Sequence, residues 1–438
     1  MASSIISNQT QWKLTIPETH CYLGKVFYHI NVQVGNVSWI VKRRYSEFAE
    51  LNATLTRDQG LNKDLLPPKK FVGNLDPRFI DQRRILLELY LNRIFQLLLK
   101  TMPTSLANFL DLGNHDVMFI IKEIPRKLVA EEAKLSVLEV HSLSARLKLP
   151  CPPVDMIGYQ HDISSLLESC SRTVSLSIDG SVEQRPSAEN PPTMDFIPFK
   201  ALKFLQLTNV PPDLIVSADA LRNTLERLSW IDSGLTSIED ALLCDSVHKN
   251  QFEYRKWAVN DINLSKNCIK CVGSAVALVP DLLSLNLSSN QIESMEGLNS
   301  LDKLQKLDVS DNGILCFLDL GIDQRLASLR WINLANNRLT SLKGLGHFKS
   351  LNYLDVSSNA IGNFDEISHL CRLPHLTDLI MENNSISTNC DYRVKVLELF
   401  DDRASFVSVD GVPPSRKELD KVAVLQALRM VKEGRSPL

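Results

Sequence analysis

The chain has 438 residues, of which 44% are hydrophobic and 23% charged, so buried cores are expected and wholesale disorder is not. At about 150 residues per domain, this length predicts about two to four domains. The 48 basic and 51 acidic residues leave a net charge of −3, which disfavours a generally basic nucleic-acid-binding protein. No apolar run reaches about 18 residues and residues 1–10 are polar. We therefore expect no transmembrane helix and no signal peptide, so membrane association would be peripheral.

The first 115 residues predict an α+β domain with a three-stranded sheet and helices. Apolar and β-branched runs predict strands near residues 12–17, 26–34 and 37–42, with a hairpin turn at Gly35–Asn36. Helical patterns come next in the chain, and a proline-rich break lies at residues 66–69. Residues 83–100 predict a strongly amphipathic helix.

Residues 119–195 give a weaker signal. Residues 127–147 have a helical composition, whereas residues 180–193 are rich in Ser, Glu and Pro and predict a loop. We therefore expect a helical connector and linker over residues 119–195. It would form either a small domain of its own or an elaborated cap for the second half of the chain.

The second half contains an internal repeat. Six asparagines each have apolar residues at positions −8, −5, −3 and +2, and they are spaced 22 to 25 residues apart: Asn267, Asn290, Asn312, Asn337, Asn359 and Asn384. This pattern matches the leucine-rich repeat template, in which each unit adds one short strand and a return segment. Apolar positions then stack between units, and the asparagines hydrogen-bond backbone groups and form a ladder. Such a repeat predicts an α/β solenoid.

The repeats are expected to be irregular at both ends. Two weaker units begin at Leu202 and Leu225, with Val210 and Ser233 at the asparagine position. We predict repeats over residues 196–389. Residues 390–434 predict a helical C-terminal cap: an amphipathic helix at 391–400, then a capping box of Ser415 and Glu418 before a helix with four inward residues, Leu419, Val422, Leu425 and Leu428.

The repeat register also predicts which side chains face outward on the concave surface. Positions −6, −4 and −2 alternate with the buried positions of each strand. They give a small, polar surface that becomes mildly acidic toward the C-terminus, with two aromatic residues on neighbouring strands. The predicted protein-binding residues are Trp331, Tyr353, Asp308, Asp355 and Ile380. The alternative is that Trp331 and Tyr353 only stack on each other.

No catalytic or metal-binding motif is present. The phosphate-binding loop, the zinc-protease helix and the nucleophile elbow are all absent from the sequence. The nine cysteines are scattered, and the one tight pair, Cys268 and Cys271, has no second pair at zinc spacing. We therefore expect no metal, no cofactor and no enzymatic activity.

Four short motifs with basic and aromatic residues follow the predicted strands near the N-terminus. Arg43 to Phe48 (RRYSEF), Leu65 to Phe71 (LLPPKKF), Arg83 and Tyr90 come after the three strands in order. Over residues 9–118 this segment resembles a PX domain, the phosphoinositide-binding module of endosomal proteins. The resemblance implies that Arg44 binds the 3-phosphate, Tyr45 packs against the inositol ring, Lys69 contacts the 1-phosphate, and Arg83, opening the last long helix, holds the 4- and 5-hydroxyls.

The chemistry of these side chains agrees with such a ligand. Guanidinium groups form strong, charge-assisted bonds with phosphate oxygens. Phe71, Val72 and Leu75 come shortly after Lys69 and are predicted to insert into the membrane. In the alternatives, Arg43 and Arg44 are solvated strand-end charges, Tyr45 is a core residue, and Phe71 belongs to the core; we expect Phe48 in the core.

A PX-like domain followed by SDS22-like repeats, with a D-Y-R-x-K-V-L stretch in the cap, resembles the nischarin family. The resemblance implies a cytoplasmic protein, peripheral on early and recycling endosomes, that binds phosphatidylinositol 3-phosphate. It also implies scaffolding of integrin tails and of Rho- and Rab-family GTPases, with self-association as a further option. A second contact through the repeats would lengthen residence on the membrane. The alternative is an SDS22-like regulatory repeat protein whose PX unit binds protein rather than lipid.

Overall fold

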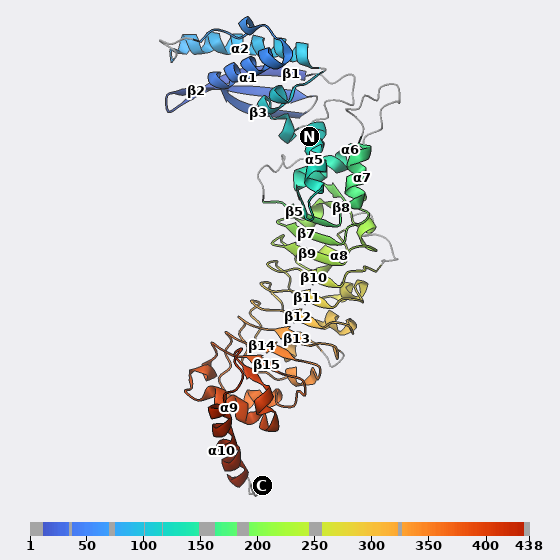
Figure 1. Cartoon of the computed structure of the whole chain (residues 1–438), viewed down its shortest axis with the longest axis vertical. Helices are drawn as coiled ribbons and strands as arrows, with labels where there is room; N and C mark the ends of the chain where they lie inside the picture. Colours follow the sequence, from blue (N-terminus) through green and yellow to red (C-terminus); the bar gives the residue numbers. More distant parts are fainter. Residues whose placement is uncertain are drawn as a thin grey trace. The chain divides into compact units, whose positions relative to one another are not determined.

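The computed structural model describes residues 12–34, 37–69, 75–99, 101–115, 117–148, 163–181, 192–244, 256–322 and 326–432. The chain divides into two compact units, residues 1–127 with 138–166 and residues 128–137 with 167–438. Their elements are labelled in Figure 1. In the described part of the chain, no helix is both long and apolar enough to cross a membrane.

The first unit contains a three-stranded antiparallel sheet in the order β1–β2–β3. Its strands are β1 (Trp12–Tyr22), β2 (Lys25–Val34) and β3 (Val37–Arg44). The three predicted strands are present, and each extends beyond its predicted end or start. Apolar residues at every second position of β2, such as Tyr28, Ile30 and Val32, are fully buried, because alternate side chains of a strand point to the same face. The predicted turn at residues 35 and 36 lies outside the described residues.

Helices pack against this sheet and close the core. They are α1 (Tyr45–Gln59), the 3-10 turn η1 (Lys63–Leu65), α2 (Pro77–Leu98), α3 (Thr104–Phe109) and α4 (Leu112–His115). As expected, Phe48 lies in the core, where its ring contacts the rings of Tyr28, Tyr90 and Phe109.

Helix α2 begins earlier than predicted. Its N-cap is Asp76, whose carboxylate accepts a 2.9 Å bond from the N–H of Arg78, and Pro77 occupies the first turn. An aspartate before a proline is a good start signal, because proline has a helical φ and needs no hydrogen-bond acceptor there. Arg83 therefore lies in the second turn of α2 and does not open it, which corrects the prediction.

The segment predicted as a helical connector contains strands as well as helices. It includes α5 (Val117–Leu128), β4 (Ala133–Ser136), α6 (Val137–Lys148), α7 (Ser164–Arg172), β5 (Ser175–Asp179) and β6 (Met194–Asp195). Strands β4 and β5 pair in parallel, and β5 pairs with the first strand of the repeats. The parallel sheet thus begins well before residue 196, where we expected the repeats to start. The strands escaped prediction because they are short and lack the repeat asparagine.

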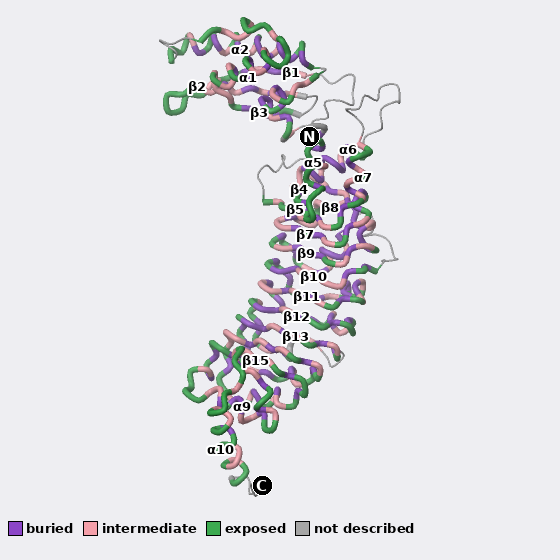
Figure 2. Tube along the Cα trace, viewed as in Figure 1, coloured by how far each residue is buried: buried purple, intermediate pink, exposed green. Residues whose placement is uncertain are grey.

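The second unit is built on one parallel sheet of 11 strands, in the order β16 to β9 and then β7, β5 and β4. Besides β4 and β5, the strands are β7 (Phe204–Thr208), β9 (Arg227–Ile231), β10 (Asp261–Asn263), β11 (Ser284–Asn286), β12 (Lys306–Asp308), β13 (Trp331–Asn333), β14 (Tyr353–Asp355), β15 (Asp378–Ile380) and β16 (Ser408–Val409). Strand β8 (Ile215–Ser217) pairs with β6 in a separate sheet. In each strand from β10 to β15 the central residue is buried, and Figure 2 shows this buried layer continuing along the repeats.

Short helical turns return the chain between these strands. They are η3 (Pro212–Leu214), η4 (Asp219–Leu221), α8 (Ile238–Leu242), η5 (Ser274–Leu278), η6 (Glu296–Ser300), η7 (Leu318–Leu320), η8 (Leu345–His347), η9 (Phe364–His369) and η10 (Ser385–Thr388). Their inward leucines, among them Leu298, Leu320 and Leu345, are buried against the strands.

The predicted asparagine ladder is present. The amide of Asn337 donates to the carbonyl of Leu334 in its own repeat and to that of Val309 in the preceding one. Its oxygen accepts from the N–H groups of Asn312 and Ile314. Each asparagine thus satisfies buried backbone groups in two successive repeats.

The C-terminal segment contains α9 (Tyr392–Leu399), η11 (Asp401–Phe406) and α10 (Arg416–Lys432). The predicted capping box is present, since the Glu418 carboxylate accepts from both the N–H and the hydroxyl of Ser415 at 2.8 Å. Of the four residues predicted to face inward, Val422 is buried, but Leu425 and Leu428 are 36% and 55% exposed. The prediction is wrong for these two, because α10 extends past the α9 surface that covers its first turns.

Candidate functional site

The junction between β3 and α1 places two of the predicted site residues. Arg44 ends β3 and Tyr45 begins α1, and the Glu47 carboxylate accepts a 2.8 Å bond from the Arg44 N–H. The Arg44 side chain lies 3.8 Å from Glu47 and over the Phe27 ring, with 40% of its surface exposed. The backbone is therefore fixed, while the guanidinium stays accessible to a ligand.

Arg43 has a different role from its neighbour. Its guanidinium donates to the carbonyls of Phe109 and Asn108 and to the Asp111 carboxylate, at 3.0, 3.2 and 2.7 Å. These bonds tie β3 to the end of α3. Arg43 is thus a structural residue, and the interpretation of both arginines as solvated strand-end charges is wrong for it.

Tyr45 holds the proline-rich segment in place. Its hydroxyl donates a 2.5 Å bond to the carbonyl of Pro67, two residues before Lys69. The start of this segment is held as well, because Asn52 donates to the Lys63 carbonyl at 3.0 Å and accepts from Tyr90 at 3.2 Å. Partial burial raises the pKa of Tyr45, against a smaller opposing effect of Arg83. Tyr45 therefore stays neutral and serves as a donor and a ring surface.

The guanidinium of Arg83 is buried between two rings. Its central carbon lies 4.4 Å from the ring centre of Tyr45 and 4.2 Å from that of Phe79, and the residue is only 7% exposed. Arg83 hydrogen-bonds the phenol of Tyr28, whose pKa is raised chiefly by burial. Among the described residues, Nε and Nη2 of Arg83 have no hydrogen-bond partner. A buried donor without an acceptor is costly, so these nitrogens are suited to an external acceptor.

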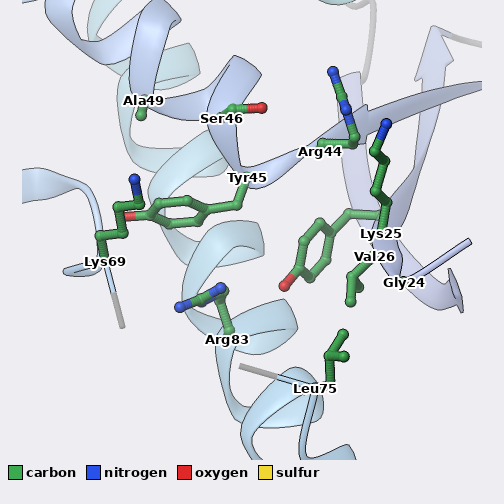
Figure 3. Close-up of a pocket in the computed structure, with 11 residues that line it drawn as sticks. Gly24, Lys25, Val26, Arg44, Tyr45, Ser46, Ala49, Lys69, Leu75 and Arg83 are labelled. Carbon is green, nitrogen blue, oxygen red and sulfur yellow. The ribbon is translucent and has the colours of Figure 1, made fainter. Parts of the chain in front are cut away.

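These side chains line one cavity of about 360 Å³. In Figure 3 the labelled cations come from different elements around Tyr45. Lys25 belongs to β2, Arg44 to β3 and Arg83 to α2, while Lys69 comes directly after Pro68. Among the described residues that line the cavity, four are cationic and none is acidic. The cavity is thus suited to a small, multiply negative ligand.

The structure brings all four predicted lipid-binding residues to this cavity: Arg44, Tyr45, Lys69 and Arg83. Of the three residues predicted to insert into the membrane, Leu75 lines the cavity and is 52% exposed, whereas Phe71 and Val72 lie outside the described residues. Their roles remain predictions.

Sequence reasoning missed Lys25, Tyr28 and Phe79. Phe79 precedes Arg83 by one helical turn, a spacing that places two side chains on the same face. The helix start signal at Asp76 and Pro77 would have placed Phe79 in the same helix as Arg83. Tyr28 reaches the cavity from β2, and only the tertiary packing brings it to Arg83.

The predicted aromatic pair lies on the sheet of the repeats. Trp331 and Tyr353 pair across β13 and β14, and their rings stack at 5.2 Å and 9°. Asp308 on β12 and Asp355 on β14 occupy the next outward position, as Ile380 does on β15. Partial burial raises the pKa of Tyr353, and Asp355, Asp378 and Asp308 add to this effect. The rings do stack on each other, as the alternative expected, and they remain half-buried rather than covered.

Comparison with known protein families finds one match near the N-terminus and one in the second half of the chain. Residues 32–113 match the family described as "PX domain", and residues 327–369 match "Leucine Rich repeats (2 copies)". A PX domain, a domain of the phosphoinositide-binding kind, and leucine-rich repeats, which mediate protein interactions, are therefore both present.

Individual relatives are similar over about a fifth of this chain. Kinesin-like protein KIF16B of Homo sapiens is 36% identical over 99 residues, which are 22% of this chain and 8% of that protein. The PX domain-containing protein kinase-like protein of Rattus norvegicus is 40% identical over 95 residues, 21% of this chain and 16% of that protein. The chain thus spans less than a fifth of the length of these relatives.

Solved structures give weaker likenesses. An internalin (inlF) from Listeria monocytogenes is 20% identical with a TM-score of 0.36, covering 51% of this chain and 58% of that one. A designed CISK-PX domain is 31% identical with a TM-score of 0.21, covering 22% of this chain and 97% of that one.

Proposed function

We propose that this protein is a non-enzymatic peripheral membrane scaffold that binds phosphatidylinositol 3-phosphate through its PX domain. The observation that carries the proposal is the Arg83 guanidinium, which is buried between two rings and keeps two nitrogens unpaired among the described residues. Such an arrangement is costly in the absence of a ligand, so its natural complement is an acceptor that enters the cavity.

Each cation has a distinct part in recognising the headgroup. Arg44, the more exposed arginine, offers its planar fork to the 3-phosphate, and Lys69 supplies a point charge to the 1-phosphate. The buried Arg83 donates to the 4- and 5-hydroxyls, and the ring of Tyr45 packs against the inositol. Phosphates at positions 4 and 5 would add bulk and charge where the rings of Tyr45 and Phe79 already enclose Arg83, which favours the monophosphorylated lipid.

The membrane contact extends beyond the headgroup. Leu75 is exposed at the cavity, and we propose that it enters the lipid interface together with Phe71 and Val72. Basic residues at such an interface add about 1 kcal/mol each on an anionic surface. This lipid preference would place a cytoplasmic protein on the membranes of early and recycling endosomes.

The rest of the chain would bind protein partners. We propose a PX domain over residues 9–118, a repeat sheet that begins with β4 and β5 and continues through the leucine-rich repeats to residue 389, and a helical cap to residue 434. The nischarin-like order of these parts suggests integrin tails and Rho- or Rab-family GTPases as partners. A lipid contact and a repeat contact acting together would prolong residence on membranes through effective concentration.

Liposome flotation of the full chain tests the proposal. Vesicles of phosphatidylcholine with about 3% of each phosphoinositide in turn are compared for wild type, Arg44→Ala and the control Arg43→Lys, which keeps a charge on the structural position. We expect flotation with phosphatidylinositol 3-phosphate that is lost in Arg44→Ala and kept in the control. Wild-type protein that floats with none of the lipids would instead identify the PX unit as a protein-binding module.

A further inference from the structure

We infer that the outward face of strands β12 to β15 binds a positively charged, extended segment of a partner protein, with two arginines three residues apart. The inference rests on the part of the proposed function that assigns the repeats to protein binding. It does not depend on the lipid site, and it names the chemistry of the partner.

The first observation is a row of four side chains across the four strands. Lys306, Trp331, Tyr353 and Asp378 are successive partners in the parallel register. The Lys306 ammonium lies 4.4 Å from the Trp331 ring centre, and the Trp331 ring stacks on Tyr353. One end of the aromatic stack is therefore covered by a cation of this chain. At the other end the neighbour of Tyr353 is the carboxylate of Asp378, which is where a cation from a partner would be stabilised.

The second observation concerns the residues next to this row. In five successive repeats the side-chain oxygen at position −4 accepts a bond from the backbone N–H two residues later. The acceptors are Asn263, Asn286, Asp308, Asn333 and Asp355. Asparagine makes this bond at three of the five positions, so the turn does not require a negative charge. The two aspartates lie on the strands on either side of Trp331. Asp308 also accepts bonds from the Ser310 hydroxyl at 2.7 Å and the Asn333 amide at 3.3 Å, and both of these donors are neutral.

The charges of this face are unbalanced. The strands β12 to β15 carry three carboxylates, those of Asp308, Asp355 and Asp378, and one ammonium, that of Lys306. Within the described ranges, no lysine or arginine forms an ion pair with any of the three carboxylates. Just outside the strands, Asp311 and Glu382 add negative charge, which Arg330 partly offsets. The face is thus an electrostatic complement for cations.

Geometry narrows the occupant to an extended basic segment. Neighbouring strands lie about 4.8 Å apart, so Asp308 and Asp355, two strands apart, are separated by roughly 10 Å. A polyproline II segment rises about 3.1 Å per residue and repeats every three residues, so arginines at i and i+3 lie about 9.3 Å apart on one side. Guanidinium groups also stack on aromatic rings and pair with carboxylates, which suits them to this surface better than ammonium groups.

The test is fluorescence anisotropy of a labelled peptide, Ser-Pro-Arg-Pro-Ser-Arg-Pro-Ser, titrated with the full chain at low ionic strength. Asp308→Asn with Asp355→Asn removes both charges and keeps the turn bonds, so we expect affinity to fall about three- to tenfold. Lys306→Met replaces the cation over the Trp331 ring by a neutral side chain and so removes a charge that repels the peptide; we expect two- to threefold tighter binding at roughly constant stability. The control Asp302→Asn with Asp420→Asn removes two exposed charges elsewhere and leaves affinity unchanged.

The outcomes separate this inference from the lipid proposal. We expect no binding of a peptide that has glutamates in place of the arginines. The inference is overturned if this peptide binds as tightly as the arginine peptide, or if wild type does not bind the arginine peptide. An unchanged affinity in the aspartate variant also overturns it. Flotation of the same variants on phosphatidylinositol 3-phosphate is expected to be unaffected. Wild-type protein that does not float with phosphatidylinositol 3-phosphate would refute the lipid proposal and leave the peptide result unaffected.

Discussion

Replacing Arg83 by methionine is expected to weaken lipid binding strongly without destabilising the PX domain. Methionine keeps an unbranched, apolar chain between the rings of Tyr45 and Phe79 but removes the buried charge. Burying the two nitrogens that lack partners among the described residues costs about 1–3 kcal/mol each. The favourable contacts that the substitution removes are two cation–π contacts, worth about 0.5–2 kcal/mol each, and the bond to Tyr28, worth about 1 kcal/mol.

These opposing contributions nearly cancel. The free energy of unfolding should therefore stay the same or rise by about 1 kcal/mol. Removing one partner of an ordinary buried ion pair would instead lower it by about 3–5 kcal/mol. Affinity for phosphatidylinositol 3-phosphate should fall by about 10- to 100-fold, because charge-assisted bonds to the headgroup are lost.

Amide hydrogen exchange of the full chain measures this stability locally. Amides in the middle of α2, around Leu87 and Leu91, report the free energy of opening without requiring two-state unfolding of the whole protein. The matched control is Arg84→Met. The neighbouring Arg84 is bonded to Asp81 at 2.9 Å and to the Ile16 carbonyl at 2.7 Å, so its loss should weaken the contact of α2 with β1 and spare lipid binding. A destabilisation of more than about 2 kcal/mol by Arg83→Met would show that Arg83 is kept for the fold, and would refute the reasoning.

Three further substitutions test other parts of the structure. Tyr45→Phe removes the bond to the Pro67 carbonyl but keeps the ring, so flotation on phosphatidylinositol 3-phosphate should weaken a few-fold, with about 1 kcal/mol lost from local stability by hydrogen exchange. Asn337→Ala leaves buried backbone groups of two repeats unpaired and should lower the free energy of urea unfolding of the repeats by about 3 kcal/mol or more; a loss under about 1 kcal/mol would contradict the ladder's role. A hydrogen bond from Arg393 lowers the pKa of Glu418 to about 2. The ionised Glu418 therefore stabilises the folded chain fully above about pH 4.5, and this stabilisation is lost as the pH falls toward 2. In thermal melts we expect about 1–2 kcal/mol of stability to be lost in acid, and Glu418→Gln should remove this pH dependence.

The local patterns of this sequence were enough to predict its repeated part. Each asparagine and its apolar partners recur at fixed spacing, so the buried layer and the ladder could be deduced from that spacing alone. The same holds for the outward pair Trp331 and Tyr353, because successive side chains of a strand alternate between its two faces. The three strands of the first unit could be predicted from their runs of apolar and β-branched residues, and Phe48 lies in the core as expected.

Other features depended on contacts between distant segments. The burial of Arg83 between Tyr45 and Phe79, its bond to Tyr28, and the anchoring of Arg43 by Asp111 join residues up to 68 positions apart. No local pattern encodes these contacts, because side-chain partners across a core are chosen by packing in three dimensions. Strands β4 and β5 join the parallel sheet for a related reason: they lack the repeat asparagine, and a strand of four or five residues is stabilised by its neighbour rather than by its own sequence.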